Sequence, residues 1–394
     1  MKYAIVVMDG AADRPLKALD GCTPMQAAET PNCDALADQG RVGLVRTVIE
    51  AEYPDAAVSA PVLMGADPSE RYTARGPLEA LAHDIHLEPR DRVWRCNFVT
   101  LADGAMADYS AGHITTGEAR LLVDSLNDEL GGEGVEFVSG VSYRALLVLR
   151  DVGTLDIETA PPHDIYDRLV EPCQPRGDDA RRLVDLMRRA ADVLAPHDVN
   201  RVRLDMGENP ATGIWPWGGG AAMTLPSFDE LYGKKAAVIS AVDLWRATAM
   251  GMGVEVIEAP SATGSIDTDT ASIGRMAVEA LVDHDVVVAH VEAPDEATHT
   301  GQVTEKVRAI ERVDGDIVGP LREALGDGPH RILVAVGHAA SCDTRGNLPD
   351  AAPFAIAGQE VQHISDLPFH ERGARKSDLT IEDGYQLMEY FLRV

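Results

Sequence analysis

The chain lacks any uncharged apolar run that approaches the thickness of a bilayer, which argues against a transmembrane helix. Its first nine residues do not have the pattern of a secretory signal either, because they carry one lysine and their apolar run stops at Asp9. This opening is typical of a first β-strand. We therefore expect a cytoplasmic protein.

Lysine is scarce, with 6 residues against 29 arginines, and these 35 bases face 64 acids, so the formal net charge is −29. A field of this sign disfavours nucleic acid and anionic membrane surfaces as partners. An acidic, lysine-poor surface suits a salt-rich cytoplasm, but a GC-rich genome gives a similar arginine bias, and the composition does not separate the two. Any anionic substrate must be met by a local positive site, formed by arginines or metal ions.

Cysteine is also sparse, and no Cys-x-x-Cys pair occurs. An odd, dispersed set favours reduced thiols over a disulfide framework or a structural zinc site. We expect these side chains to act as small buried apolar groups. They are Cys22, Cys33, Cys96, Cys173 and Cys342.

What remains is the composition of an ordinary globular protein, with 394 residues of which 45% are hydrophobic and 25% charged. Short β-branched runs alternate with stretches of helical periodicity, which predicts a mostly parallel sheet covered by helices on both faces, an α/β fold. The predicted strands are residues 3–8, 235–241, 254–257, 286–290 and 332–336, and the predicted helices are residues 25–39, 243–250, 271–282 and 303–325.

The middle of the chain departs from this alternation. Its predicted strands and its one helix are residues 92–100, 136–138, 143–149 and 116–130. The simplest account is an α+β unit inserted into the parallel-sheet core. We expect residues 1–85 and 180–394 to form the core and residues 86–179 to form an inserted, substrate-covering domain.

Three predicted strands end in side chains that can bind a metal. Asp9 ends the first strand, His338 follows residues 332–336, and Asp295 and His299 follow residues 286–290 at the spacing of one helical turn. The carboxyl ends of parallel strands form the ligand-binding edge of a sheet. Carboxylates and imidazoles that converge there suit a divalent cation such as Mn²⁺ or Zn²⁺. Taken singly, each of these residues is also common in turns, at helix starts or in structural hydrogen bonds.

Several motifs occur in one order along nearly the whole chain. They include Asp9-Gly-Ala-Ala-Asp13-Arg-Pro15, Gly65-Ala-Asp-Pro68, Arg75-Gly-Pro-Leu-Glu79, Trp215-Pro-Trp-Gly-Gly-Gly220 and Asp295-Glu-Ala-Thr-His299. In this combination the chain resembles the archaeal-type cofactor-independent phosphoglycerate mutases, a branch of the alkaline phosphatase superfamily. The combination is specific for the family and less specific for activity, because the superfamily contains phosphatases, sulfatases and mutases.

The resemblance implies a phosphatase-like core with an inserted domain, two adjacent metals, and a serine that carries the phosphoryl group between hydroxyls of one glycerate. Two cations roughly 3.5–4 Å apart neutralise the phosphate and lower the pKa of the serine. The family's metal ligands match Asp9, Asp295, His299 and His338, and Arg75, Asn97 and Arg144 match its pattern as substrate-binding residues.

The chain departs from the family pattern where the chemistry is expected. Counting back from Gly65 places the nucleophilic serine at Ala56 and its neighbouring acid at Ala57, while two more metal ligands fall on Gly337 and Asn347. The motif Asp-Arg-Arg-Ala-Gly-Arg occurs as Asp108-Tyr-Ser-Ala-Gly-His113, without three arginines.

Two remaining ligands per cation seldom hold a divalent metal without substrate oxygens or replacement ligands. We therefore expect at most one weakly held Mn²⁺, Zn²⁺ or Mg²⁺ and no organic cofactor. The residues that lie near enough in sequence to serve as replacements are Asp55, Ser59, Cys342 and Asp343.

These departures favour a mutase-like enzyme with a degenerate active site. We expect it to be repurposed for phosphoryl or phosphonyl transfer without a phosphoserine, in a specialised biosynthesis. Its substrate would be a small phosphorylated or phosphonate-like molecule. Three alternatives stay open: an ordinary cofactor-independent phosphoglycerate mutase with Ser59 as nucleophile, a metal-dependent hydrolase, and a catalytically silent binding or regulatory homologue. The sequence predicts no oligomeric state.

Overall fold

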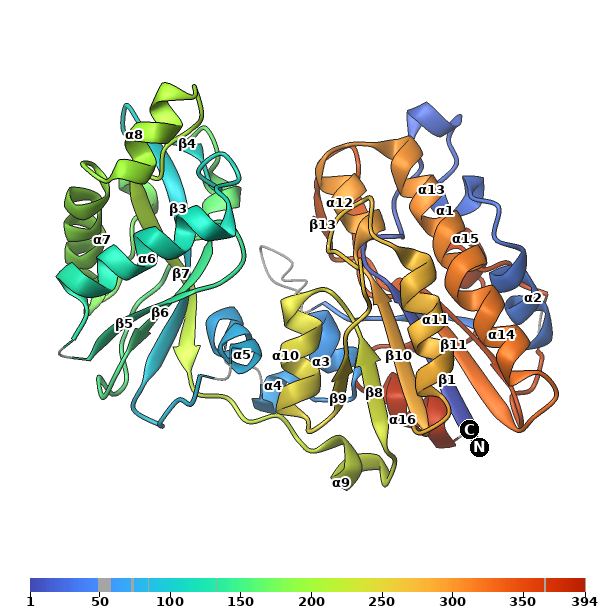
Figure 1. The fold of residues 1–394 in the computed structure, drawn as a ribbon. Coiled ribbons are helices and arrows are strands. Elements are labelled where there is room, and N and C mark those ends of the chain that lie inside the picture. Colours follow the sequence, from blue (N-terminus) through green and yellow to red (C-terminus); the bar gives the residue numbers. More distant parts are fainter. Residues whose placement is uncertain (49–57, 72–73, 84, 133, 365, 394) are drawn as a thin grey trace. The chain divides into compact units, whose positions relative to one another are not determined.

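The computed structural model describes every residue except 49–57, 72–73, 84, 133, 365 and 394. The chain divides into two compact units, residues 1–72 with 225–394 and residues 73–224 (Figure 1). The second unit is a single segment that interrupts the first. It extends beyond the expected range of residues 86–179 at both ends, by one helix before it and by two helices and a strand after it.

The first unit is built on an eight-stranded sheet with the order β15-β2-β14-β11-β1-β10-β8-β9. At its centre β1 (Lys2–Met8) lies between β10 (Val286–Val291) and β11 (His330–Val336), parallel to both. On the far side of β10, β8 (Ala236–Ile239) and β9 (Glu255–Ile257) continue the parallel part. These five strands are the ones that the apolar runs predict.

Three strands that the sequence did not indicate complete the sheet. β14 (Ala352–Gly358) runs antiparallel to β11, β2 (Arg41–Val45) runs antiparallel to β14, and β15 (Thr380–Ile381) runs parallel to β2. The sheet is therefore mixed and mainly parallel, which confirms the predicted α/β class.

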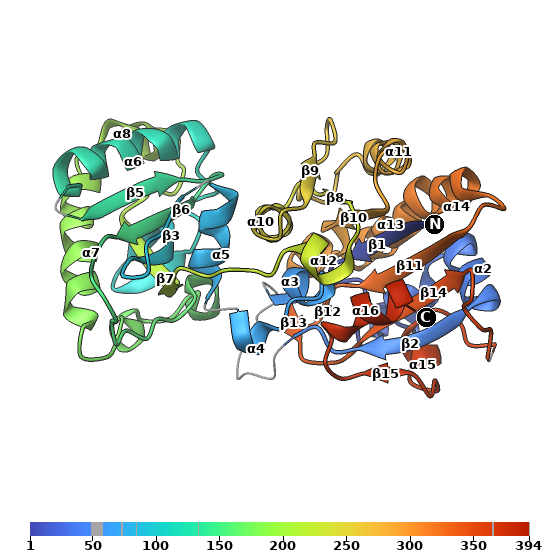
Figure 2. The same ribbon diagram turned by 90° about the horizontal axis from the view of Figure 1, so that it is seen from below.

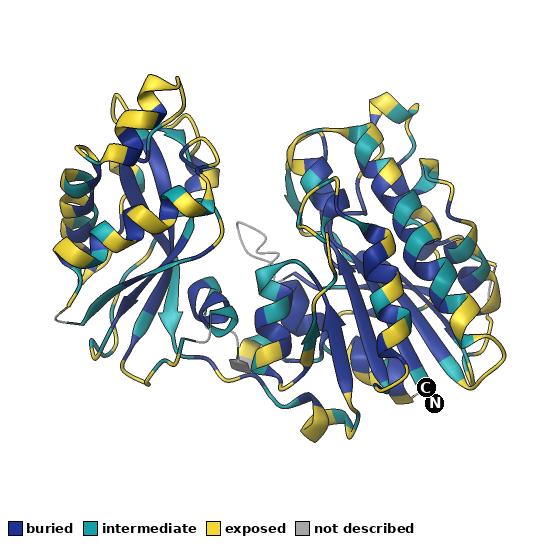
Figure 3. Ribbon diagram, viewed as in Figure 1, coloured by how far each residue is buried: buried dark blue, intermediate teal, exposed yellow. Residues whose placement is uncertain are grey.

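Helices cover both faces of this sheet (Figures 1 and 2) because its central strands are apolar on both sides. Val6 of β1 belongs to one core cluster, and Val7 lines a small cavity on the other face. Figure 3 shows β1, β10 and β11 buried along nearly their whole length. The first face is covered by α2 (Pro31–Gln39), α11 (Thr270–Ala280), α13 (Val303–Val313) and α14 (Gly319–Leu325), and the second by α3 (Ser59–Leu63) and α16 (Gln386–Arg393).

The helix predicted over residues 303–325 is continuous in the structure but changes its pitch in the middle. A π-helical turn, Asp314–Val318, joins α13 to α14. Pro320 lacks the N–H group that an α-helix needs at that position, which favours a local change in the hydrogen-bond pattern. Within the π-helical turn, the Asp314 carboxylate accepts hydrogen bonds from the backbone N–H groups of Asn32 and Cys33, at 3.1 and 2.7 Å.

Shorter elements complete the first unit: α1 (Pro24–Ala27), α4 (Pro68–Arg71), α9 (Phe228–Tyr232), α10 (Asp243–Gly251), α12 (Ala293–His299), α15 (Glu371–Ala374), and the hairpin of β12 (Ala339–Ser341) and β13 (Gly346–Leu348). None of the helices in the described part of the chain has the length and apolarity needed to cross a bilayer.

The second unit is an antiparallel sheet centred on β3 (Arg92–Ala102). This strand pairs with β4 (Ala105–Asp108), β6 (Arg144–Leu149) and β7 (Gly213–Ala221), and β6 also pairs with β5 (Val135–Ser139). Because β7 pairs with β3 along most of its length, the chain remains in this unit well beyond residue 180.

Alternate residues of β3 face different neighbours. Trp94 and Phe98 pack in a core with α6 (Thr116–Leu130) and α7 (Ala180–Leu194), whereas Val93 packs with α5 (Arg75–Ala82). The side chains of Arg95 and Asn97 share the face of Val93 by the two-residue period of a strand. The polar side chains of Arg95 and Asn97 thus lie on a sheet face that is otherwise apolar at Val93.

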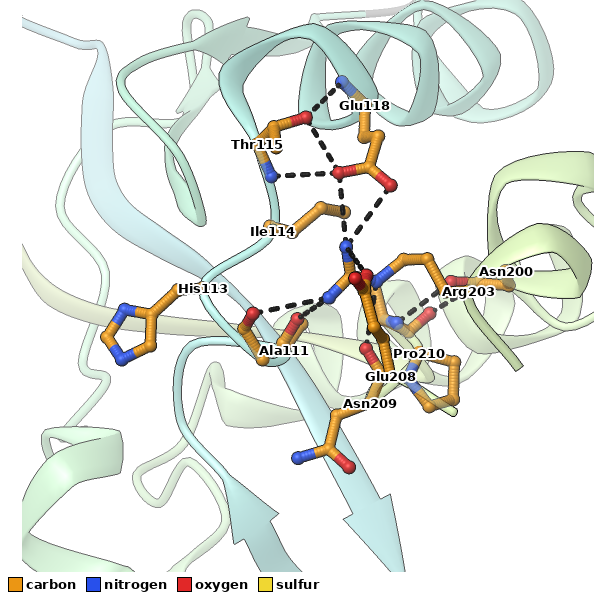
Figure 4. A network of polar contacts seen from close by, with 12 residues as sticks. Ala111, His113, Ile114, Thr115, Glu118, Asn200, Arg203, Glu208, Asn209 and Pro210 are labelled. Carbon is orange, nitrogen blue, oxygen red and sulfur yellow. Dashed lines mark hydrogen bonds and ion pairs between the residues drawn. The ribbon is translucent and has the colours of Figure 1, made fainter. Parts of the chain in front are cut away.

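Figure 4 shows how α8 (Asp198–Asp205) fixes the loop that precedes α6. The buried guanidinium of Arg203 forms an ion pair with Glu118 at 3.1 Å and donates hydrogen bonds to the carbonyl oxygens of Ala111, at 2.8 Å, and Asn209, at 2.9 Å. Charge-assisted bonds of this kind are stronger than neutral ones. They hold the segment that carries Tyr109 and His113 in place.

Candidate active site

The carboxyl ends of three central strands meet at one edge of the first unit's sheet. Backbone hydrogen bonds join the loops there: Asp9 N–H donates to Val291 O and Gly10 N–H to His338 O, both at 3.1 Å. Gly10 has a φ of +66°, and a Cβ at this position would come within 2.4 Å of Asp295 Oδ1. Glycine therefore permits both the turn after β1 and the close approach of Asp295.

The structure brings together all four sequence-predicted metal ligands. Asp295 Oδ1 lies 3.1 Å from His338 Nε2, and Asp295 Oδ2 lies 3.1 Å from His299 Nε2. His338 Nδ1 is 3.7 Å from Asp9 Oδ1. Asp295 and His299 share one face of α12, as their spacing predicts.

Two residues that the sequence analysis did not select, His290 and Glu292, lie in the same cluster. His290 Nε2 is 2.8 Å from Asp9 Oδ2. Asp9, His290 and Glu292 each offer one ligand atom, and these atoms all lie within 4.8 Å of one another. The sequence did contain a feature that could have indicated both residues. His290 lies near the carboxyl end of β10, and Glu292 lies between this strand and Asp295.

The charges of this cluster perturb one another. Burial raises the pKa of Asp295, but His338 and His299 outweigh it and hold that pKa well below its usual range. Burial lowers the pKa values of both histidines, yet contact with Asp295 raises each to about 9. Burial and the neighbouring carboxylates Asp9 and Asp295 raise the pKa of Glu292 to about 8. Three acids in one buried site favour a positive charge among them.

The unpaired polar atoms of the cluster fit a cation. Within the described residues, Asp9 Oδ1, His338 Nδ1 and Asn347 Oδ1 are buried and have no hydrogen-bond partner. Buried polar groups are otherwise nearly always paired. His299 Nδ1–H donates to Arg345 O at 3.0 Å, which fixes the ring and leaves Nε2 as the nitrogen that can bind a metal. This donor set of carboxylates and imidazoles fits a divalent cation.

The other expected ligand positions add no ligand atom to this cluster among the described contacts. A Cβ on Gly337 would lie 1.6 Å from Asp9 Oδ1, so Asp9 occupies the space that a side chain at 337 would need. Cys342 is buried, with its Sγ 4.0 Å from Thr298 Oγ1, and burial raises the pKa of its thiol. Asp343 is exposed.

The segment expected to hold the nucleophile is only partly described. Ala56, Ala57 and Asp55 lie outside the described residues. Ser59 is the first residue of α3 and is buried, with 1% of its surface exposed.

The three predicted substrate-binding residues all lie in the second unit. Asn97 of β3 is in register with Arg144 of β6. Asn97 Oδ1 accepts hydrogen bonds from Arg95 Nε and Trp217 Nε1, both at 3.1 Å, and its Nδ2 donates to Tyr109 O at 3.0 Å. The Asn97 amide is therefore engaged within the protein.

Arg75 joins the same group through Glu79. The Glu79 carboxylate pairs with Arg75 Nε at 2.8 Å and with the buried guanidinium of Arg95. Burial raises the pKa of Glu79, but Arg95 and Arg75 outweigh it and lower that pKa to about 2. The guanidinium of Arg75 also lies 5.2 Å from the ring centre of Trp217, within the range of a cation–π contact. Arg95, Glu79 and Trp217 were not predicted as site residues, although two of them stand in the quoted motifs.

Aromatic rings stand at two of the three positions where the family pattern has arginines. Tyr109 and His113 contact Tyr143 edge-on, at ring-centre distances of 6.0 and 6.1 Å. Arg144 lies over the same Tyr143 ring at 5.1 Å. Edge-to-face contacts of this kind stabilise a fixed arrangement of rings beside the guanidinium.

The fold and this site define a class of protein: a mainly parallel α/β sheet that gathers carboxylates and imidazoles at the carboxyl edge of its central strands. Comparisons with known proteins identify the family. Residues 37–200 match the family model described as 2,3-bisphosphoglycerate-independent phosphoglycerate mutase.

Full-length relatives extend this match over the rest of the chain. A 2,3-bisphosphoglycerate-independent phosphoglycerate mutase from Methanothrix thermoacetophila is 44% identical over 394 residues, which cover 100% of both chains. A second, from Methanothermobacter thermautotrophicus, is 42% identical and covers 100% of this chain and 97% of its own. The solved structure of the PH0037 protein from Pyrococcus horikoshii, 26% identical, has a TM-score of 0.82 over 99% of this chain and 96% of that one. The chain belongs to the cofactor-independent phosphoglycerate mutase family, as its motifs indicated.

These relatives overturn the functional expectation drawn from Ala56. A mutase-like enzyme repurposed for phosphoryl or phosphonyl transfer without a phosphoserine was the favoured hypothesis, and it is wrong: relatives named phosphoglycerate mutase match the entire chain at 42–44% identity. Nor do the comparisons support a transferase activity or a degenerate active site. Four changed positions do not outweigh the similarity of the remaining chain.

Proposed function

We propose that this protein is a phosphoglycerate mutase that needs a divalent metal and no organic cofactor, and that it exchanges the phosphoryl group between two hydroxyls of one glycerate. The observation that carries the proposal is the 44% identity to a relative of that name over all 394 residues. A small phosphorylated substrate, a cytoplasmic location and no nucleic-acid partner are parts of the same proposal. The net charge of −29 supports the last part.

Asp9, Asp295, His299 and His338 are the proposed metal ligands. Two observations support them: distances between 3.1 and 3.7 Å join the four residues, and neither Asp9 Oδ1 nor His338 Nδ1 has a hydrogen-bond partner among the described residues. A divalent cation bound there supplies positive charge that neutralises a phosphoryl group and lowers the pKa of a nearby hydroxyl. The metal can be Mn²⁺, Zn²⁺ or Mg²⁺ by the chemistry of these donors.

Arg75 and Arg144 are the proposed anion-binding residues of the substrate. Both are guanidinium groups at partly exposed positions, held over the rings of Trp217 and Tyr143. Asn97, with 2% of its surface exposed and its amide engaged by three protein groups, supports binding indirectly by orienting Arg95 and Trp217. Guanidinium groups suit carboxylate and phosphate because their N–H donors match two oxygens at once.

A mutase of this kind needs a hydroxyl that holds the phosphoryl group between its departure from one carbon and its arrival at the other. Ala56 has no oxygen for this step. We assign the step to Ser59, the hydroxyl three residues further along the chain, at the start of α3. Its oxygen loses its proton as it bonds to phosphorus, and the first glycerate oxygen leaves and takes up a proton. In the reverse sense, the second glycerate hydroxyl loses its proton as it attacks phosphorus, and the serine hydroxyl is restored.

The test is direct conversion of 3-phosphoglycerate followed by ³¹P NMR, with Mn²⁺ present and no added bisphosphoglycerate. The expected result is the appearance of 2-phosphoglycerate, its loss on treatment with a chelator, and its return when Mn²⁺ is restored. The variant Asp295→Asn should be inactive, and Asp283→Asn, which changes an exposed acid of the same unit, should be fully active. Failure of the folded, Mn²⁺-loaded protein to form 2-phosphoglycerate contradicts the proposal, and release of inorganic phosphate alone favours a hydrolase instead.

A further inference from the structure

The side chain of His290 is buried beside Asp9 and is bonded at both ring nitrogens. Its Nε2 lies 2.8 Å from Asp9 Oδ2, and its Nδ1 lies 2.9 Å from Ser240 Oγ. None of its side-chain surface is exposed. A histidine so enclosed has no free nitrogen for a metal unless one of these two bonds breaks.

The contact with Asp9 fixes the direction of one hydrogen bond of this ring. A carboxylate oxygen only accepts hydrogen bonds, so His290 Nε2–H donates to Asp9 Oδ2. On the other side of the ring, Ser240 Oγ bonds Nδ1 and also accepts from the backbone N–H of Val242 at 3.0 Å. The serine is itself held by the backbone, and it keeps the ring in the orientation that directs Nε2–H at Asp9.

Trp245 of α10 reinforces the contact. Its ring stacks on His290, with ring centres 4.7 Å apart and an interplanar angle of 22°. Its Nε1–H group points at the same Asp9 oxygen, at 3.4 Å. Asp9 Oδ2 thus receives donors from two neighbouring elements, β10 and α10.

The other oxygen of Asp9, Oδ1, has a different environment. Oδ1 is buried and receives no hydrogen bond from any described residue, and its ion-pair contact with His338 Nδ1, at 3.7 Å, is too long for a hydrogen bond. The carboxylate therefore has one oxygen bonded to protein donors and one oxygen free to bind a cation. A side chain held in this way offers a single ligand atom at a fixed position.

We propose that His290, held by Ser240 and Trp245, is a positioning residue that occupies Asp9 Oδ2 so that Asp9 binds the metal through Oδ1 alone. His290 acts through Asp9 and is not itself a ligand, although its distance to Asp9 and Glu292 would also permit that role. The inference rests on the proposed metal at this edge of the sheet. Outer-shell partners of this type change metal affinity by about tenfold to a hundredfold when they are removed.

The experiment measures Mn²⁺ binding to the purified full chain at fixed pH, by the EPR signal of free Mn²⁺, and it needs no turnover. His290→Phe keeps a ring that can stack on Trp245 but removes both nitrogens, and His290→Gln keeps an N–H donor that can reach Asp9. We expect affinity to fall about tenfold to a hundredfold in the first variant and by less than about threefold in the second, with the number of bound ions unchanged. His284→Gln is the matched control, because His284 is a buried histidine of the same unit whose nitrogens bond Ala280 O and Glu255 at 3.0 Å.

The outcomes separate the alternatives. If His290 is a ligand, both variants lose affinity equally, and the ¹⁴N couplings of bound Mn²⁺ in pulsed EPR decrease. If His290→Phe binds Mn²⁺ as the parent does, the positioning role is wrong while the metal site stands. If the parent chain itself binds no Mn²⁺, the proposed function fails first. Should His290→Phe not fold, Ser240→Ala decides: affinity equal to that of the parent overturns the proposal, and a weaker affinity at unchanged thermal stability supports it.

Discussion

At the scale of single residues, the proposed carrier of the phosphoryl group is open to direct test. Ser59→Ala removes one oxygen from a buried position and adds no bulk, so we expect thermal stability and Mn²⁺ binding to change little and mutase turnover to be lost. In the parent chain quenched during turnover, intact mass spectrometry should show one added phosphoryl group, and peptide mapping should place it on the peptide that contains Ser59.

The exposed Ser69→Ala serves as the matched control, because Ser69 lies on α4 and bonds only the nearby Asp67 among the contacts given by the structure. Turnover that survives in Ser59→Ala, or phosphorylation at another residue, would overturn the assignment of Ser59 while leaving the metal site untouched.

A second prediction at this scale concerns Glu79 and acid. Its pKa is about 2 in the folded protein and 4.5 in the unfolded chain, because Arg95 and Arg75 favour its ionised form. A lowered pKa stabilises the fold fully above the unfolded value and loses that contribution as the pH falls towards the folded value. The stability contribution of Glu79 should therefore decrease by about 2 kcal/mol between pH 6 and pH 3.

Urea unfolding of the parent and of Glu79→Gln at a series of pH values measures this contribution. The variant should be less stable at pH 6, because Arg95 is left buried without its acid. The difference in unfolding free energy between the two proteins should then narrow as the pH falls below 4.5. A difference that stays constant down to pH 3 shows that Glu79 has an ordinary pKa.

At the scale of elements, a buried ion pair joins three segments around the site: the loop after β1, helix α13 and the hairpin of β12 and β13. Lys306 of α13 and Asp13, four residues after Asp9, have no exposed side-chain surface and lie 3.0 Å apart. Lys306 Nζ also donates to Ala340 O at 2.8 Å, and Cys342 N–H donates to Asp13 Oδ2 at 3.0 Å. The loop after β1, helix α13 and the hairpin after His338 are thereby held in one arrangement.

Removing one member of this pair should be costly, because the other is left as a buried unpaired charge. We expect Lys306→Met to lower the unfolding free energy by about 3–5 kcal/mol, and the double variant with Asp13→Asn to recover part of the loss. Urea unfolding measures both, with the exposed Lys376→Met as control. Losses in the double variant that equal the sum of the two single losses indicate that the pair is not coupled.

Elements also show what the sequence could and could not predict. The i, i+4 spacing after Pro294 correctly placed Asp295 and His299 on one helical face, because a helix has a strong period. His290 was missed because β10 is buried on both faces, so its residues show no alternation that separates a site residue from a core residue. β7 was missed for a related reason: Pro216 and four glycines argue against a strand, although pairing with β3 forms one.

At the scale of the whole molecule, boundaries were less predictable than architecture. The alternation of strands and helices was enough for the α/β class, because it reflects local burial. This alternation was not enough to predict where the second unit ends, because that boundary depends on the pairing of β7 with β3 across more than a hundred residues of chain. Long-range pairing leaves little trace in any short window of sequence.

The last prediction follows from the way the second unit interrupts the first. Residues 73–224 form one compact segment with a core of their own, in which Leu122, Leu147 and Leu183 are fully buried. The two ends of the segment lie close together, because a Cβ on Gly76 would lie 3.0 Å from Gly218 O. Independent folding is common for inserted segments with adjacent ends.

We therefore expect the excised fragment of residues 73–224 to fold alone and to unfold in one cooperative thermal transition, measured by circular dichroism and calorimetry. The substitution Leu147→Ala, which creates a cavity in that core, should lower the unfolding free energy of the fragment by about 2–5 kcal/mol. The same substitution in the full chain should leave Mn²⁺ affinity unchanged, because the proposed ligands belong to the other unit. A fragment without a cooperative transition, or a full chain in which Leu147→Ala weakens Mn²⁺ binding, shows that the two units do not fold independently.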